Sequence, residues 1–478
     1  MKKKTLIFLI IIFLFGFIVR IYKIHEPIAD WHSFRQSDTA AVSKIYAREG
    51  IDMLYPKYYD ISNVQSGLDN PSGYRFVEFP LYNVFHALLS NTFSFFSFEI
   101  WGRLINIFAS LASAFAIYLL VRKYANEISA RFSLIAFLFL PFSIFYSRSI
   151  LPDVMMTTSI LTGTYFFDKY LEKRRNTRVT ILFYILALFF VALAFLLKPF
   201  SLFFTFPLVY LAWKKYSIKI FFSIPLWIFA VSAVAPLIWW RYWISQFPEG
   251  IPVSAWLFNG NGIRLRPAFF RWILYERITK LILGFSGIIF LLGSFWSLKK
   301  KNIFFFLSFA FSSMVYLIII ATGNVQHDYY QIAIIPTISI FVGLGAYEIY
   351  KFIAKRTFSI FGFMVVGILF LTAFLFSWNQ VKDYFNINDR NMVEAGRRAD
   401  EILPQNALVI APYDGSSTLL NMVSRRGWPV FQSSVEDLIK KGADYLIIAS
   451  PTENDRMGFG RQYEILESSD AYLILRLQ

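Results

Sequence analysis

The sequence predicts a polytopic α-helical membrane protein of about 11 transmembrane helices, followed by a small C-terminal α/β domain. Of the 478 residues, 56% are apolar and only 16% are charged, and the mean hydropathy is +0.50. This composition excludes an ordinary soluble globular protein. Apolar runs of near-spanning length recur up to about residue 377, and beyond Trp378 they shorten while charge rises. We therefore expect a transmembrane domain at 1–378 and a soluble domain at 385–478.

The first predicted span lies in the N-terminal segment MKKKTLIFLIIIFLFGFIVRIYKI. Its basic start is typical of a signal peptide, but it lacks a small-residue cleavage site and its apolar run is close to spanning length. We therefore expect an uncleaved helix over about residues 5–22. Further spans are expected at about 101–121, 129–147, 151–170, 179–197, 200–213, 220–240, 281–298, 303–321, 331–350 and 357–377.

Basic residues between the apolar runs indicate the orientation of the chain, because cytoplasmic loops carry an excess of Lys and Arg. Counted from a cytoplasmic N-terminus, alternate loops carry Lys2, Lys3 and Lys4; Arg122, Lys123 and Arg131; Lys173, Arg174, Arg175 and Arg178; Lys214, Lys215 and Lys219; Lys299, Lys300 and Lys301; Lys351, Lys355 and Arg356. A full span from Pro80 to Phe98 would place the later clusters outside, so we expect this stretch to lie along the interface or to re-enter. The C-terminal domain is then external to the plasma membrane.

The net charge of +16 follows from these loops, so we expect contact with membrane lipid and no nucleic-acid partner. The chain has no cysteine, which excludes a disulfide framework and a thiolate metal site.

The C-terminal segment alternates strand-like and helical patterns. Strands are predicted at ALVIAP, WPVFQ, ADYLIIAS, YEILES and AYLILRL, and helices at NMVEAGRRADEIL, SSTLLNMVSR and VEDLIKKG. This alternation predicts an α/β sandwich. It contains no glycine-rich phosphate loop and no metal-ligand spacing, so acceptor docking, a lid and a structural cap are the roles that we consider.

Residues able to do chemistry gather just after the first apolar helix, in IADWHSFRQSDTAAVSKIYAREG. Asp30, His32, Arg35 and Asp38 lie within nine residues of one another, and the residues after Asp38 have good helix propensity. We expect Asp38 to be the N-cap of a helix that faces out of the bilayer. Capping and catalysis are the two roles open to this acid.

The motif SFRQSDTAAVSKIYAREG resembles the first external loop of the GT-C membrane glycosyltransferases, the class of protein O-mannosyltransferases and lipid A aminoarabinose transferases. In that class this loop supplies the catalytic acid, so the resemblance implies that role for Asp38, although Thr39 stands where the family usually has Glu. Transfer from a lipid phosphate requires a base for the acceptor, whereas the phosphate leaving group requires charge stabilisation. Arg35 is a candidate contact for that phosphate.

Asp153, in RSILPD, resembles the second acid of the family and is again expected at a helix N-terminus. Arg148 beside it is a candidate phosphate clamp, with an ion pair to Asp153 as the alternative. Lys198 and Pro199 form the short external turn expected between two neighbouring spans. The Lys198 side chain is expected either to contact phosphate or to extend towards the membrane surface.

Glu78, in YRFVEFPLYN, resembles the acid that helps to hold a divalent metal in the aminoarabinose transferases, although Phe79 stands where those enzymes have Lys. A divalent cation is therefore the cofactor that the resemblance implies. His327, in QHDYY, resembles part of the family's tyrosine-pair segment and is a candidate substrate contact or ligand. An interfacial histidine with a structural role is the alternative, since the histidines show no HxxxH-type spacing.

These observations favour an enzyme that takes a sugar from a polyprenyl-phosphate donor on the external face and transfers it to a lipid, glycan or protein acceptor. The resemblance implies inversion at the anomeric carbon. A lipid or polysaccharide transporter is the alternative, but no intramembrane carboxylate pairs or inverted repeats are evident in the sequence. A membrane-anchored binding module would leave the loop acids unexplained.

Overall fold

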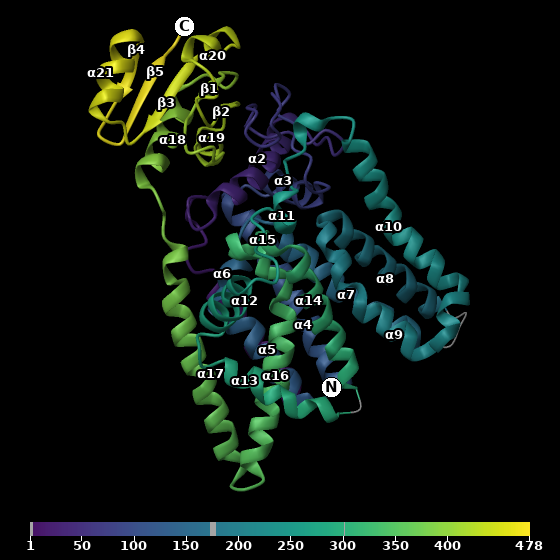
Figure 1. Ribbon diagram of the computed structural model, residues 1–478. Helices are drawn as coiled ribbons and strands as arrows, with labels where there is room; N and C mark the ends of the chain where they lie inside the picture. Colours follow the sequence, from purple (N-terminus) through teal and green to yellow (C-terminus); the bar gives the residue numbers. More distant parts are fainter. Residues whose placement is uncertain (1–2, 173–177, 301) are drawn as a thin grey trace. The chain divides into compact units, whose positions relative to one another are not determined.

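The structure is a computed structural model whose described residues are 3–172, 178–300 and 302–478 (Figure 1). Among the basic residues assigned to cytoplasmic loops, those outside this range are Lys2, Lys173, Arg174, Arg175 and Lys301. The chain forms two compact units, each built from segments that are distant in sequence. The bundle unit comprises Met1–Tyr22, Leu104–Trp240 and Ser254–Asp383, and the sheet unit comprises Lys23–Arg103, Arg241–Val253 and Tyr384–Gln478.

The predicted apolar runs form helices. Those in or entering the bundle unit are α1 (Lys3–Arg20), α4 (Phe98–Tyr124), α5 (Glu127–Phe139), α6 (Pro141–Tyr146), α7 (Pro152–Glu172), α8 (Arg178–Leu197), η1 (Pro199–Thr205), α9 (Phe206–Tyr216), η2 (Ser217–Phe222), α10 (Ile224–Ile244), α11 (Trp256–Asn259), α12 (Pro267–Phe270), the π-helix η4 (Arg271–Ile282), α13 (Ile288–Ser294), η5 (Phe295–Lys299), α14 (Ile303–Ile319), α15 (Ala321–Gln326), η6 (Asp328–Ile334), α16 (Ile335–Ala354) and α17 (Ser359–Val381). Figure 1 shows α16 and α17 running side by side.

Prolines divide these helices. The predicted run 129–147 is two helices, because Leu140 precedes Pro141 and takes an extended conformation with ψ 122°. Lys198 is likewise extended before Pro199, where η1 begins. Both interruptions follow from the clash between a proline ring and the residue before it.

Five helical segments of the described chain are long and apolar enough to cross a membrane: Phe98–Tyr124, Arg178–Leu197, Ile224–Ile244, Asp328–Ala354 and Ser359–Ile402. The prediction of a helical, multi-pass membrane protein is confirmed, whereas the number of spans and their orientation remain predictions. The stretch after Pro80 forms α3 (Leu81–Thr92), which has 12 residues. At 1.5 Å per residue such a helix is about 18 Å long, too short to cross an apolar layer of about 30 Å.

The sheet unit contains the predicted α/β domain. Its elements include α2 (Ser33–Glu49), α3, η3 (Pro248–Gly250), α18 (Arg390–Ile402), β1 (Val409–Ile410), α19 (Thr418–Val423), β2 (Gly427–Trp428), α20 (Val435–Lys440), β3 (Tyr445–Ala449), α21 (Glu453–Gln462), β4 (Glu464–Ser468) and β5 (Tyr472–Arg476), and η7 (Lys382–Phe385) leads into it. The strand order is β2-β1-β3-β5-β4, parallel from β2 to β3 and antiparallel from β3 to β4. The predicted small sheet is confirmed, while α21 was not predicted, because its polar sequence has no apolar periodicity.

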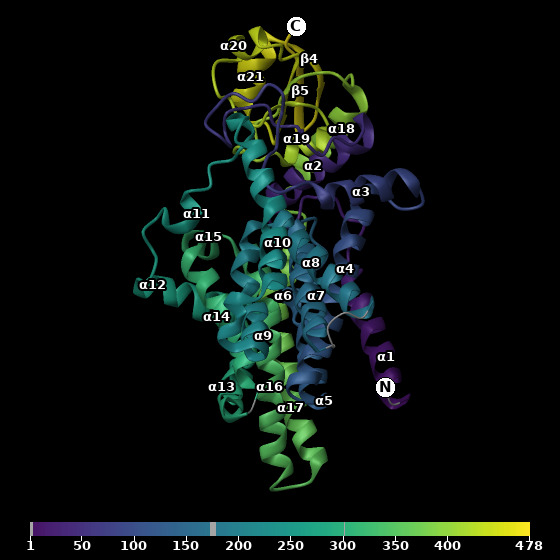
Figure 2. The ribbon, with the colours of Figure 1, turned by 90° about the vertical axis from the view of Figure 1, so that its right-hand side faces the viewer.

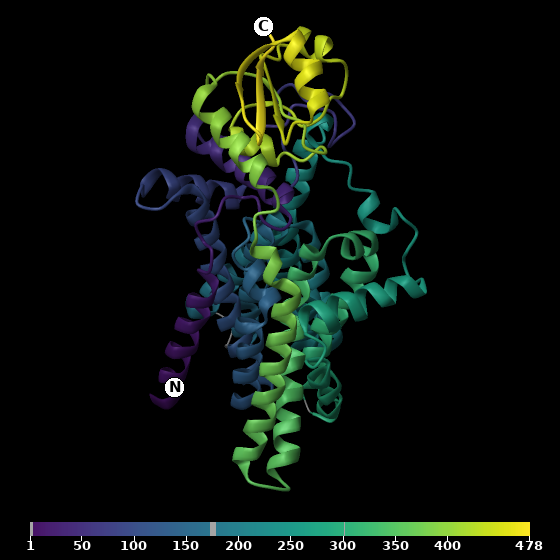
Figure 3. The same ribbon diagram turned by 90° about the vertical axis from the view of Figure 1, so that its left-hand side faces the viewer.

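Two hydrophobic cores cover the two faces of this sheet, and the ribbon views show helices on both sides of it (Figures 2 and 3). Successive side chains of a strand point to opposite faces. Accordingly Ile447 of β3 packs with α18, α19 and α2, and Leu446 packs with α20. The segment before α3 also joins the sheet, because Ile61 donates its backbone N–H to Gly427 of β2. Residues 23–103 therefore belong with the C-terminal domain, which differs from the expected division at residues 378 and 385.

Candidate functional site

Helix α2 carries the acid predicted to be catalytic, but not at its N-terminus. The helix begins at Ser33, and its N-cap is His32, which has a left-handed backbone with φ 54°. The prediction that Asp38 is the N-cap was wrong, because the turn at His32 lets Ser33 to Ser37 join the helix. The backbone N–H of Gln36 accordingly donates to the carbonyl of His32. Asp38 lies inside α2, where no capping role is open to it.

Asp38 is buried and both of its carboxylate oxygens accept a hydrogen bond. The guanidinium of Arg75 donates to Oδ2 at 2.6 Å, and the hydroxyl of Ser417 donates to Oδ1 at 2.6 Å. One turn earlier in α2, Arg35 donates to Glu78 at 2.5 Å. Two ion pairs thus join α2 to the segment that precedes α3. In one pair α2 provides the cation, and in the other it provides the anion. They bring together three predicted site residues, Arg35, Asp38 and Glu78, within the sheet unit.

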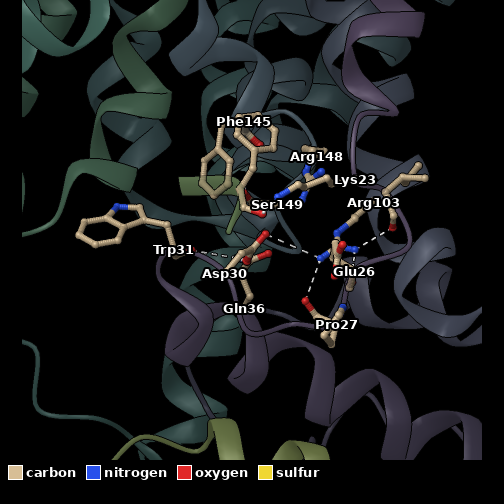
Figure 4. Close-up of polar contacts among 12 residues, drawn as sticks. Lys23, Glu26, Pro27, Asp30, Trp31, Gln36, Arg103, Phe145, Arg148 and Ser149 are labelled. Atoms are coloured by element: carbon tan, nitrogen blue, oxygen red, sulfur yellow. Dashed lines mark hydrogen bonds and ion pairs between the residues drawn. The ribbon is translucent and has the colours of Figure 1, made fainter. Parts of the chain in front are cut away.

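A second acid, Asp30, lies in the loop before α2 and is also buried (Figure 4). The amide of Gln36 donates to its Oδ1 at 2.7 Å, and Nη2 of Arg103 lies 3.8 Å from its Oδ2. Arg103 also donates to the backbone carbonyls of Glu26 and Pro27. The guanidinium therefore fixes both the loop and the orientation of the Asp30 carboxylate. Sequence reasoning grouped Asp30 with the residues able to do chemistry but assigned it no role.

A third acid, Asp60, lies near the Asp38–Arg75 pair. It accepts hydrogen bonds from the backbone N–H of Ser62 at 2.8 Å and from the Tyr58 hydroxyl at 3.4 Å. Burial raises the pKa of Asp60 to about 6, and the nearby charge of Asp38 contributes in the same direction. No motif in the sequence pointed to this residue.

In the bundle unit, Asp153 occupies the first turn of α7, where a negative charge is favourable. Nζ of Lys198 lies 3.6 Å from Oδ2 of Asp153, and both side chains are about 5% exposed. Lys198 is thus buried against an acid. Arg148 is also buried and donates to the backbone carbonyl of Tyr22. The structure therefore gives the predicted cations Lys198 and Arg148 fixed positions.

His327 lies between α15 and η6 with aromatic neighbours. Its ring stacks on that of Tyr329, with centroids 5.5 Å apart, and meets Trp256 edge-on at 5.7 Å. The next residue, Asp328, accepts a hydrogen bond from the Tyr146 hydroxyl and lies 4.0 Å from Nη1 of Arg277. Sequence reasoning singled out His327 but not the buried Asp328 beside it.

The residues do not fit the expected divalent metal. Glu78 is paired with Arg35, and the described residues hold no group of three or more His, Asp or Glu side chains that could bind a metal ion. His86, near Glu78 in sequence, is buried against the carbonyl of Phe98 at 2.8 Å. Burial lowers the pKa of His86 to about 4. We assign no step to a metal.

The sequence and the structure are each similar to those of known proteins. Residues 80–240 match the family described as dolichyl-phosphate-mannose-protein mannosyltransferase. No curated protein sequence matches the chain. The structure is similar to ArnT from Cupriavidus metallidurans bound to undecaprenyl phosphate, with a TM-score of 0.67 and 10% identity over 100% of this chain and 98% of that chain. It is also similar to the oligosaccharyltransferase AglB from Archaeoglobus fulgidus in complex with an inhibitory peptide and a dolichol-phosphate. That match has a TM-score of 0.58 and 10% identity over 94% of this chain and 70% of that one.

Both solved structures are membrane glycosyltransferases of the class that the motif at Asp38 resembles, and the family matched by residues 80–240 is of the same class. The match to ArnT includes the C-terminal sheet as well as the helical bundle, because it covers the whole of this chain. The chain therefore has the fold of the GT-C superfamily of membrane glycosyltransferases.

Proposed function

We propose that this protein is a glycosyltransferase that takes a sugar from a polyprenyl-phosphate donor and transfers it to an acceptor on the external face of the membrane. The observation that carries the proposal is the full-length fold match to a protein bound to undecaprenyl phosphate. The match to a protein in complex with dolichol-phosphate supports the same class of donor. The acids and cations described above are of the types that this reaction requires.

The reaction is a displacement at the anomeric carbon. An acceptor hydroxyl or amine forms a bond to this carbon as the bond to the phosphate oxygen breaks, and the acceptor's proton passes to a carboxylate. Attack opposite the phosphate inverts the configuration. The phosphate leaves with its negative charge, which a buried lysine or arginine stabilises. In this proposal Lys198 and Arg148 of the bundle unit provide that charge, Asp153 holds Lys198 in place, and His327 of the same unit is a further candidate substrate contact. Arg35 of the sheet unit is a separate candidate contact.

For the base we propose Asp30, with Asp38 as the alternative. A base is effective when a further group orients it, as Gln36 and Arg103 orient Asp30. Asp38 is also contacted on both oxygens, but its hydrogen bonds from Arg75 and Ser417 connect α2 to two segments that are distant in sequence. These contacts support a role for Asp38 in positioning α2.

The test uses the purified full-length protein in lipid nanodiscs with labelled polyprenyl-phosphate sugars and a crude extract of cell-envelope acceptors. The expected result is release of free polyprenyl phosphate together with a labelled acceptor, and loss of both products in Asp30→Asn. Translocation of the intact donor without release of lipid phosphate would replace the enzyme by a transporter. If the wild-type protein neither cleaves nor moves the donor, the proposed function is wrong.

A further inference from the structure

Two polar cavities adjoin helix α18 within the sheet unit. The first, of about 640 Å³, is lined on α18 by Arg390, Glu394, Arg397 and Arg398, among others. The second, of about 400 Å³, is lined by residues of α2, α4, α18 and the end of α19. Arg397 belongs to both cavities and therefore marks the place where they meet.

The cavities contain positive charge that the fold does not use. Arg398 is committed, since its guanidinium donates to Glu467 at 2.8 and 2.9 Å. Within the described part of the chain, by contrast, Arg390 and Arg397 make no ion pair and no side-chain hydrogen bond. They lie seven residues apart on α18, which places them on one face, about 10 Å from each other along the axis. Both side chains are exposed, so their guanidinium groups are available to a ligand at the cavity.

Lys44 and Arg48 extend this charge into the second cavity. Both project from α2. The ammonium of Lys44 donates to the carbonyl of Asn421 at 2.8 Å, and Nη1 of Arg48 donates to the carbonyl of Ser424 at 3.2 Å, which leaves the other nitrogens of this guanidinium for a ligand. Asp400 also lines the cavity, but it is paired with Arg425 at 2.6 Å. The negative charge that remains there is that of Glu99. Positive charge therefore prevails around Arg397 in this cavity, which suits an anion.

The lining also indicates that the anion belongs to a membrane lipid. Phe98 and Glu99 are in the first turn of α4, a helix long and apolar enough to span a membrane. In the chain, the cavity residues 23–27 follow the apolar helix α1, and residues 386–390 follow the apolar helix α17. Segments that adjoin the ends of membrane-spanning helices are expected at the level of lipid headgroups, which carry phosphate.

We propose that the two cavities around Arg397 form a binding site for the headgroup phosphate of a membrane lipid whose headgroup carries a net negative charge. Arg397 and Arg48 hold the phosphate oxygens, and Arg390 lies on the same side of α18. Binding at this site does not depend on sugar transfer, so it is measured without a donor.

The test measures binding of fluorescent phosphatidic acid to the purified full-length protein in a neutral detergent, with fluorescent phosphatidylcholine as the zwitterionic probe. The wild-type protein is expected to bind phosphatidic acid at least tenfold more tightly. Arg397→Gln and Arg48→Gln should each weaken that binding about tenfold, because each removes a charged hydrogen-bond donor. Arg461→Gln is the matched control, since Arg461 is an exposed arginine on α21 that lines neither cavity.

Folding is checked by the thermal unfolding midpoint, and Arg397→Lys, which keeps the charge, should retain most of the affinity. If Arg397→Gln and Arg461→Gln bind phosphatidic acid as the wild type does, the proposal is wrong. It is also overturned if the wild type binds both lipids equally. Inorganic pyrophosphate is used as a soluble competitor. If it binds tightly while phosphatidic acid does not bind, the proposal of a lipid ligand is wrong and the site binds a soluble phosphate compound. An absence of sugar transfer would leave these binding results unchanged and would count only against the proposed function.

Discussion

Asp38 in the sheet unit and Asp153 in the bundle unit were predicted on the same grounds, as acids near external helix starts, yet their surroundings differ. Asp38 connects three segments, because its two oxygens accept hydrogen bonds from Arg75 and from Ser417, 379 residues away in sequence. Asp153 remains in the first turn of its helix, 3.6 Å from Lys198. The first arrangement suits a residue that holds the fold together, and the second suits a residue that positions one cation. Similar sequence settings therefore do not imply similar roles.

Substitution of Asp30 is expected to cause the largest loss of sugar transfer, because Asp30 is the acid that we propose as the base. Asp30→Asn keeps an oxygen for the Gln36 amide but cannot take up the acceptor's proton. We expect transfer to fall by about 10² to 10⁴, the usual effect of removing a general base. The measurement is the release of polyprenyl phosphate under single-turnover conditions, with a thermal unfolding midpoint close to that of the wild type. Near-normal transfer by a folded Asp30→Asn protein would return the role of base to Asp38.

Asp38→Asn is expected to act mainly on stability. It keeps the acceptor for Ser417 but leaves the buried guanidinium of Arg75 without its counter-charge, and breaking one partner of a buried pair costs about 3–5 kcal/mol. The double variant Asp38→Asn with Arg75→Gln removes both charges and should recover much of that loss. The measurement is the free energy of unfolding in a double-mutant cycle. A stable but inactive Asp38→Asn protein would contradict the supporting role.

Asp60 provides a smaller effect that depends on pH. Its pKa is about 6 in the folded protein and about 3.9 in an unfolded chain. Between these values the folded state keeps the proton and the unfolded state releases it, so stability falls as the pH rises from about 4 to 6 and then levels off. Asp60→Asn removes this cost and should be more stable at pH 7 by about 2–3 kcal/mol, with little difference near pH 4. Unfolding midpoints measured at these two pH values check the sign. A variant that is less stable than the wild type at pH 7 would show that the charged form of Asp60 is favoured by Arg75.

The sequence was sufficient for the helical bundle and the small sheet, because these follow from apolar periodicity and the length of the apolar runs. It was not sufficient for the surroundings of Asp38. The N-cap prediction failed because the N-cap of α2 is His32, which has a left-handed backbone and lies six residues before Asp38. The partner Ser417 is distant in the chain and carries no motif. The packing of α2 in the sheet unit likewise depends on apolar residues such as Val42 and Ile45 meeting helices that lie more than 300 residues later.

The smallest predicted effect is at Lys198 in the bundle unit. It tests whether Asp153 positions this lysine for the donor phosphate. If its ammonium binds the donor phosphate, Lys198→Gln should raise the KM for the donor about tenfold, equivalent to about 1.4 kcal/mol, and should change kcat less. Lys198→Arg should restore part of the affinity, because charge matters more here than the shape of the donor group. Asp153→Asn should also change donor KM, because the loss of its charge lets the ammonium leave its position. The measurement is initial-rate kinetics over a series of donor concentrations, with thermal unfolding as the control. Should Lys198→Gln lower the unfolding midpoint while leaving donor KM unchanged, Lys198 and Asp153 would form a structural pair and the contrast with Asp38 would disappear.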